Sequence, residues 1–186
     1  MPEHLHLPLR YHLAMASATA LSIAEYHETS YRPDREYIDG ELRERNVGKR
    51  EHARMQALLT IWFGQHESLW SVFVLTEQRV LVAPNRVRIP DVLLTSTGPQ
   101  TETLTSPPIL VVEILSPDDT YFDTQERARD YLNMGIEMVW VIDPKSRTGR
   151  MCKGDIWQEA RILRVPGTPI HLDLDTIFQH MTELRS

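Results

Sequence analysis

Cysteine is almost missing from this chain of 186 residues, which has Cys152 alone. A single cysteine excludes an internal disulfide and a cysteine-rich metal site, and it is typical of the reducing cytoplasm, where we expect this protein. The chain also lacks the roughly 20 consecutive apolar residues of a membrane helix. We interpret residues 1–20, whose apolar part is interrupted by polar residues, as an N-terminal extension, and residues 21–186 as a single domain.

Positive charge is also scarce. Lys and Arg together number 20 against 26 Asp and Glu, and the formal net charge is −6. This balance argues against a protein that coats nucleic acid through bulk charge, so any contact with a phosphate backbone must be local. One candidate is the basic stretch RERNVGKREHAR at residues 43–54, which Glu44 and Glu51 dilute. The sequence contains no P-loop, no G-x-S-x-G elbow and no dinucleotide-binding fingerprint.

The apolar residues are spaced as in a protein that mixes helices and strands. Helices are expected at residues 23–28 after a cap at Ser22, at 49–67, at 123–134 from a capping box of Asp123 and Glu126 to a stop at Gly135, and near 176–181. Asp39-Gly40 predicts a hairpin, and strands are expected within residues 72–96, 107–116, 138–142 and 161–174. This order predicts a mixed central β-sheet flanked by helices.

Glu113 is a carboxylate inside an apolar strand, ILVVEILSP. Side chains alternate along a strand, so Glu113 shares one face with Val111 and Leu115 while its neighbours point the other way. An ionised carboxylate there costs several kcal/mol unless a cation or hydrogen-bond donors meet it. Asp91 repeats the pattern in VRIPDVLL, where it shares parity with Ile89.

Two explanations are open for these acids. In the first, each acid lies at a strand end, is partly exposed to solvent and pairs with an arginine. In the second, adjacent strands bring both carboxylates together, and a divalent cation offsets their repulsion. Oxygen ligands without a cysteine or histidine cluster favour Mg²⁺ or Mn²⁺ over zinc. The presence of two such acids in one chain favours the metal.

Arg127 lies four residues before Tyr131 on the helix that follows the Glu113 strand. The helical periodicity places it at the rim of the buried arc, from which its guanidinium could reach the carboxylates. It could equally be a plain ion-pair partner for Glu113 or Asp130. The solvated face of this helix is expected to carry Glu126, Arg129 and Asp130.

The eight histidines are scattered along the chain, which favours incidental roles over a metal site. His52 lies beside the apolar face of the helix expected at residues 49–67. We interpret it as a packing histidine rather than a catalytic one.

Four segments in order, YIDGELRE, RIPDVLL, PPILVVEILSPDDT and RARDYLNMGIEMVWVIDP, resemble the Uma-type restriction endonucleases of the PD-(D/E)-x-K nuclease superfamily. The similarity runs from about Leu21 to the C-terminus. It implies an α/β fold with a restriction-endonuclease-like core, and a hydrolase that cuts DNA with Mg²⁺ or Mn²⁺. A homodimer is a further expectation from the same resemblance.

The resemblance also implies roles for individual residues. Asp91, Glu113 and the backbone carbonyl of Ile114 would ligate the metal, and Glu41 would assist through a second metal or a water. The superfamily's lysine, which this family relocates to the following helix, is Arg127 here. Arginine stays protonated, so it can hold phosphate but cannot act as a base. The sequence therefore predicts a metal-dependent endonuclease weakened by Arg127, with a catalytically inactive DNA-binding or protein-interaction module as the alternative.

Overall fold

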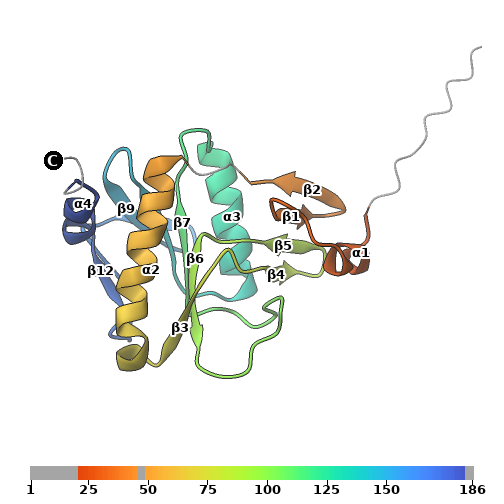
Figure 1. Cartoon of the computed structure of the whole chain (residues 1–186), viewed down its shortest axis with the longest axis horizontal. Helices are drawn as coiled ribbons and strands as arrows, with labels where there is room; N and C mark the ends of the chain where they lie inside the picture. Colours follow the sequence, from red (N-terminus) through yellow and green to blue (C-terminus); the bar gives the residue numbers. More distant parts are fainter. Residues whose placement is uncertain (1–20, 46–48, 183–186) are drawn as a thin grey trace, which may run out of the picture.

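The structure, a computed structural model, describes residues 21–45 and 49–182 and has a mixed α/β architecture (Figure 1). The helices are α1 (Ile23–Glu28), α2 (Arg50–Trp70), α3 (Tyr121–Met134) and α4 (Leu174–Thr182). The strands are β1 (Arg35–Ile38), β2 (Glu41–Glu44), β3 (Val72–Thr76), β4 (Val80–Ala83), β5 (Arg86–Arg88), β6 (Val92–Ser96), β7 (Leu110–Ile114), β8 (Val139–Asp143), β9 (Thr148–Lys153), β10 (Ile156–Glu159), β11 (Ile162–Arg164) and β12 (His171–Asp173). The N-terminal extension expected at residues 1–20 lies outside the described residues.

A six-stranded sheet in the order β10-β9-β8-β7-β6-β3 forms the centre of the molecule. Strands β7 and β8 are parallel, and the other neighbours are antiparallel. All five residues of β7 are buried, as expected for a strand covered on both faces. The mixed central sheet flanked by helices is therefore confirmed.

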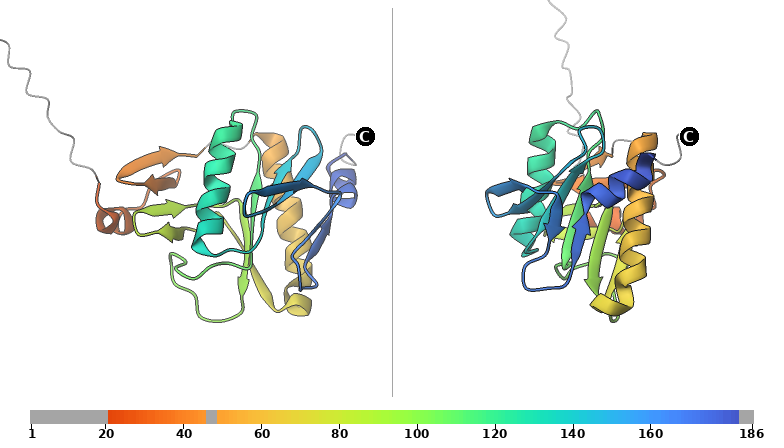
Figure 2. Two further views of the ribbon diagram at one scale, coloured as in Figure 1. Left: turned by 180° about the vertical axis from the view of Figure 1, so that it is seen from behind. Right: turned by 90° about the vertical axis from the view of Figure 1, so that its left-hand side faces the viewer.

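Helices α2 and α3 cover opposite faces of this sheet (Figure 2). Val112 and Ile114 pack in one core cluster with Leu59 of α2, whereas Val111 packs in a second cluster with Ala128 of α3. The alternation along β7 thus divides its side chains between the two helices. Glu113 has the parity of Val111, so its side chain lies on the α3 face.

A second sheet, in the order β2-β1-β5-β4, lies beside α3 at the end of the molecule that also carries α1 (Figure 1). Its β1–β2 hairpin turns at Asp39 and Gly40, whose φ angles are 51° and 97°, and this confirms the turn predicted from Asp39-Gly40. The chain leaves this sheet after β5 and enters the central sheet at β6. Residues 89–91 are therefore the junction between the two sheets.

Two of the helix ends match the residues expected to cap or end them, and one helix start does not. Ser22 caps α1 in a capping box, as expected, and Gly135 ends α3. The capping box expected at Asp123 is wrong, because Thr120 is the cap and accepts a hydrogen bond from the Asp123 amide at 3.1 Å. Of the described helices, none combines the length and apolar character needed to cross a membrane.

Candidate active site

Glu113 is 4% exposed and is held by two side chains of α3. The Tyr131 hydroxyl donates a hydrogen bond to its Oε1 at 2.7 Å, and Nε of Arg127 lies 3.3 Å from its Oε2. Both partners come from the helix that covers this face of β7. One hydroxyl and one guanidinium therefore contact the Glu113 carboxylate inside the apolar strand.

Arg127 joins Glu113 to the loop that leads from β7 into α3. Its Nη2 donates to Asp119 Oδ1 at 3.1 Å, and the other oxygen of Asp119 accepts from the amide of Ser116 at 2.7 Å. Arg127 thus pairs with Glu113, one of the two partners expected for it, and its second partner is Asp119. Burial alone would lower the pKa of Arg127, but Glu113 and Asp119 outweigh it and raise that pKa above its ordinary value.

Asp91 stands just before β6, at 3% exposure, and is held by three donors. Arg45 Nη2 donates to its Oδ1 at 2.7 Å. Its Oδ2 accepts from the amide of Ile114 at 2.7 Å and lies 3.2 Å from Nε2 of His52. The expectation that Asp91 shares a strand face with Ile89 is wrong, because the chain changes sheets between them.

Sequence reasoning missed two residues of this group, Arg45 and His52. His52 was expected to pack in the core, yet it contacts Asp91 from the first turn of α2. Burial lowers its pKa, but the hydrogen bond and charge of Asp91 outweigh burial and raise it. Both residues lie in the basic stretch 43–54, so the available signal was the local charge excess rather than either residue alone.

A cavity of about 380 Å³ brings these groups together. Asp91, Glu113, Ile114 and Arg127 all line it, as the sequence predicts for neighbouring strands. The lining also includes Glu36, Arg43, Arg45, His52, Arg88, Asp118, Asp119 and Glu126.

Glu41 is the one predicted site residue that the structure does not bring to this group. It is exposed at the start of β2 and does not line the cavity. The buried acid supplied by the same hairpin is Glu36 of β1, at 5% exposure. Its Oε2 accepts from Arg88 Nη1 at 2.7 Å, and its Oε1 accepts from the amide of Ile89 at 3.2 Å. Glu41 therefore lies outside this cavity, its assisting role stays a prediction, and Glu36 is the buried acid that this hairpin contributes.

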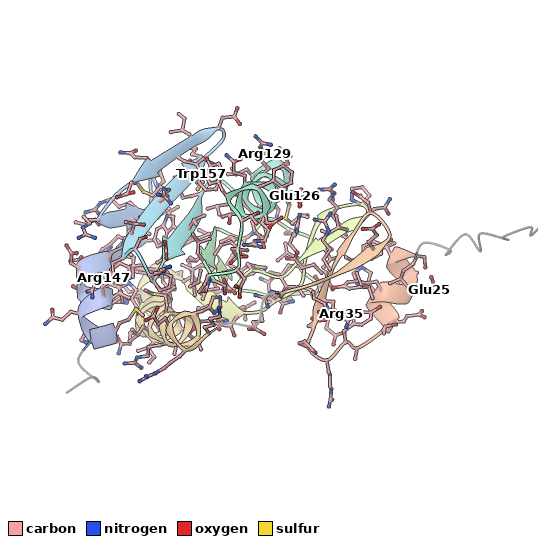
Figure 3. The ribbon with its side chains drawn as sticks, turned by 90° about the horizontal axis from the view of Figure 1, so that it is seen from above. Glu25, Arg35, Glu126, Arg129, Arg147 and Trp157 are labelled. Carbon is pink, nitrogen blue, oxygen red and sulfur yellow. The ribbon has the colours of Figure 1, made fainter. Side chains whose placement is uncertain are left out.

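Arg88 links the second sheet to α3. Its Nε donates to Asp130 Oδ2 at 2.7 Å, and it also forms an ion pair with Glu126. The solvated face expected for Glu126 and Asp130 is therefore wrong, because the second sheet covers that side of the helix. Arg129, which Figure 3 labels on the same helix as Glu126, is exposed as expected.

The electrostatics of the cavity centre on Glu113. Burial raises its pKa to about 7; Arg127 opposes this rise, and the negative charge of Asp91 adds to it. Two carboxylates therefore influence one another within a single cavity. Burial, which Arg127 opposes, therefore favours the protonated form of Glu113.

The raised pKa predicts a pH-dependent stability. A carboxyl whose pKa rises from 4.5 to about 7 on folding holds its proton more tightly in the folded chain. Its contribution is complete below the unfolded pKa and is lost as the pH rises through the folded one. In metal-free buffer we expect this group to remove on the order of 2–3 kcal/mol between about pH 5 and pH 8. Urea unfolding of the wild type and Glu113→Gln across this range measures it.

The variant should lack this part of the pH dependence, whatever its stability at any single pH. Glu159→Gln, at an exposed position on β10, supplies the control for a neutralised surface acid. Equal pH dependence in the wild type and Glu113→Gln would contradict the raised pKa.

The same cavity has oxygen atoms that could hold a cation. Each carboxylate oxygen has two lone pairs, and Asp91 Oδ1 and both oxygens of Glu113 each meet a single protein donor. In a strand, the amide and the carbonyl of one residue point to the same edge, so the carbonyl of Ile114 faces Asp91, as its amide does. The described residues contain no group of three or more His, Cys, Asp or Glu placed to bind a metal. Two carboxylates and one carbonyl would therefore need water or substrate oxygens to complete the shell.

Comparison with solved structures supports the fold. The crystal structure of a "putative nuclease belonging to DUF820" from Anabaena variabilis ATCC 29413 superposes with a TM-score of 0.74 and 19% identity, over 84% of this chain and 96% of that one. An electron cryomicroscopy structure of a DrdV–DNA complex matches 72% of this chain and 11% of its own, at 18% identity and a TM-score of 0.39, which is too low to carry an argument. No curated protein matches the chain. The model of the Uma2 family, described as "Putative restriction endonuclease", matches residues 23–178, and the chain belongs to this family.

Proposed function

We propose that this protein is a divalent-metal-dependent endonuclease that hydrolyses phosphodiester bonds in DNA. The observation that carries the proposal is the convergence of two buried acids, Asp91 and Glu113, in one cavity with the guanidinium of Arg127 3.3 Å from Glu113. Membership of the restriction-endonuclease-like family supports the reaction class and DNA as the substrate. A homodimer and a cytoplasmic location stay predictions from the sequence.

Asp91, Glu113 and the Ile114 carbonyl would hold the cation. An oxygen-only set with two carboxylates suits Mg²⁺ or Mn²⁺, because Mg²⁺ commonly uses one or two carboxylates and takes its other ligands from water and substrate phosphate. When bound, such an ion supplies Lewis-acid polarisation of the scissile phosphate. The raised pKa of Glu113 supports this assignment, because a cation beside it would favour the ionised form.

Arg127 would bind a nonbridging oxygen of the scissile phosphate. Its Nη2 donates to Asp119, whereas its Nε, 3.3 Å from Glu113, is buried and makes no hydrogen bond within the described residues. The pairing with Asp119 fixes the guanidinium plane at the cavity that Arg127 lines, so the side chain can meet the phosphate there without a rearrangement. Arg127 stays protonated and therefore stabilises charge rather than accepting a proton.

Arg45 and His52 would add positive charge on the Asp91 side of the cavity. Arg45 donates to the Asp91 oxygen that also suits a metal. A cation bound there would release Arg45 toward the substrate phosphate. Arg45 follows β2 directly and so stands outside the strand itself.

Substitution of Arg127 tests this role. Cleavage of supercoiled plasmid in Mg²⁺ or Mn²⁺ should fall on the order of 10²-fold in Arg127→Met, because the phosphate loses its guanidinium. Arg127→Lys should cut roughly tenfold faster than the wild type, because a buried lysine can lose a proton and arginine cannot. Arg129→Met and Arg129→Lys are the matched controls on the exposed face of α3.

The outcomes separate two parts of the proposal. If EDTA does not stop cleavage by the wild type, the proposed dependence on a metal is contradicted. A lysine variant as slow as the methionine variant would show that the paired geometry of arginine, and not the missing base, sets the rate.

The second candidate function is a catalytically inactive module that binds DNA or protein. It is favoured by one observation, namely that every oxygen of Asp91 and Glu113 already contacts a protein donor. In such a module the arginines neutralise the acids and no metal is needed. Calorimetry with Mn²⁺ discriminates the two functions, because only the nuclease should bind the ion, and Glu113→Gln should abolish the heat of binding.

A further inference from the structure

A second cavity, of about 670 Å³, lies next to the candidate active site. It is formed by the start of α2, the loop after β7, the loop after β8 and the end of α4. His52, Ser116 and Asp119 line both cavities. A chain bound at the active site can therefore continue into the second cavity across these three residues.

The lining of this second cavity combines two chemical characters. Its apolar residues are Leu115, Pro117, Pro144 and Met181, and its cationic residues are Lys49, Arg50, Arg54 and Lys145. This local excess of positive charge stands out in a chain whose net charge is −6. An apolar floor with a cationic rim matches a nucleotide, which has an apolar base face and an anionic phosphate.

The lining also has three acids, Glu51, Asp119 and Asp143, one fewer than its cations, and Asp119 and Asp143 are engaged in contacts within the protein. Asp119 is committed to Arg127 and to the Ser116 amide. Asp143 accepts from the backbone amide of Lys145 at 2.8 Å and from the Ser146 hydroxyl at 2.7 Å, so it closes its own turn. Among the cations, Lys49 pairs with Asp118 at 3.3 Å and Arg54 donates to the carbonyl of His180 at 3.5 Å, so an anionic ligand would compete with these partners.

Two features of α2 add to the attraction for phosphate. Lys49 is the N-cap of this helix and makes no side-chain capping hydrogen bond, and the first-turn amides of a helix attract anions. Nε of Arg54 is buried and has no hydrogen-bond partner in the described part of the chain. Lys49 and Arg54 both line the cavity, so an oxyanion bound there would lie near both residues.

We infer that the second cavity binds one unpaired nucleotide next to the scissile phosphate, so that the preferred substrate has single-stranded character at the cut. This inference rests on the proposed nuclease function and extends it. The volume falls in the range of roughly 300–1,000 Å³ that suits a small ligand rather than a duplex. In a duplex the base faces are stacked, so only an unpaired or extruded base can reach the apolar floor.

Binding measured in EDTA tests the inference without any cleavage. The probes are a fluorescein-labelled oligothymidylate, a hairpin duplex of equal phosphate count, and an abasic strand with the same backbone. The wild type should bind the oligothymidylate about tenfold more tightly than the duplex or the abasic strand, because only the first offers free base faces.

Two matched double variants separate the effect of the cavity's cations on binding from the effect of net charge. Lys49→Glu with Lys145→Glu should weaken oligothymidylate binding about tenfold or more. Lys153→Glu with Arg164→Glu makes the same change in net charge on β9 and β11, and it should weaken binding about threefold at most. Equal losses in the two doubles would overturn the inference.

Met181→Gln tests the apolar floor, with its folding checked by thermal melting. It should weaken binding of the oligothymidylate several-fold and leave binding of the abasic strand unchanged. Equal affinity of the wild type for duplex and single strand would also overturn the inference, whereas the proposed nuclease function would stand if plasmid cleavage persisted. A protein that prefers the single strand but never cleaves would keep the inferred pocket and lose the nuclease.

Discussion

Asp91→Asn should lower metal-dependent plasmid cleavage on the order of 10³-fold, the largest loss of activity expected from any single substitution here. Asparagine keeps the shape of the side chain and one oxygen for the Ile114 amide, but it removes the charge that a cation needs. Asp91 is 3% exposed and shares its cavity with Glu113, so its loss removes one of the two carboxylates proposed to hold the cation. Single-turnover cleavage rates in Mg²⁺ and Mn²⁺ measure the effect.

Asp155→Asn is the matched control for this substitution. Asp155 is exposed in the turn between β9 and β10, away from the cavity, and its variant should cleave like the wild type. Cleavage by Asp91→Asn within a few-fold of the control would exclude Asp91 as a metal ligand. Circular dichroism and thermal melting of both variants show whether either effect comes from misfolding.

Arg88→Met should destabilise the folded protein by about 3–5 kcal/mol. Arg88 is 2% exposed and makes hydrogen bonds to Glu36 and Asp130. Its removal leaves Glu36 buried without its cation and leaves Asp130 with Arg86 alone, and an uncompensated buried charge costs more than the pair itself contributes. Urea unfolding at neutral pH measures the loss.

Arg35→Met supplies the comparison for an exposed pair. Arg35 donates to Glu44 at 2.7 Å, with side-chain exposures of 36% and 73%, so the change should cost about 0–1 kcal/mol. A loss in Arg88→Met no larger than in Arg35→Met would contradict the role of Arg88 in joining the second sheet to α3.

The elements that the sequence predicts best are those whose local signal agrees with their burial. The strand around Glu113 is apolar at both parities because helices cover both of its faces. The hairpin at Asp39-Gly40 is equally predictable from the sequence, since the turn needs positive φ angles that glycine and aspartate adopt readily. The β9–β10 hairpin was missed because its strands are only half buried and carry little apolar alternation, although Gly154-Asp155 marks its turn.

The site residues form two groups, which differ in how far apart in the sequence the contacting residues are. Glu113 and Arg127 lie on consecutive elements, so strand alternation and helix periodicity were enough to predict their contact. Arg45 and His52 reach Asp91 from 46 and 39 positions earlier in the chain, through contacts that only tertiary structure sets. Local patterns cannot contain that information.

Two errors share the second sheet as their physical cause. Parity was counted from Ile89 across Pro90 to Asp91, but the chain leaves one sheet there and enters another. Asp130 was assigned to a solvated face because the helix pattern alone does not show that Arg88 covers it. An acid on a polar helix face has the same sequence signature whether water or a buried arginine meets it.

A crystal of the metal-free protein soaked in Mn²⁺ gives the most direct measurement of whether the two buried acids form one cation site. Anomalous difference density should show a peak bounded by the carboxylates of Asp91 and Glu113 and the carbonyl of Ile114, with Arg45 displaced from Asp91. Absence of that peak, with Arg45 and Arg127 still in contact with the acids, would contradict the metal-dependent endonuclease and favour the inactive module.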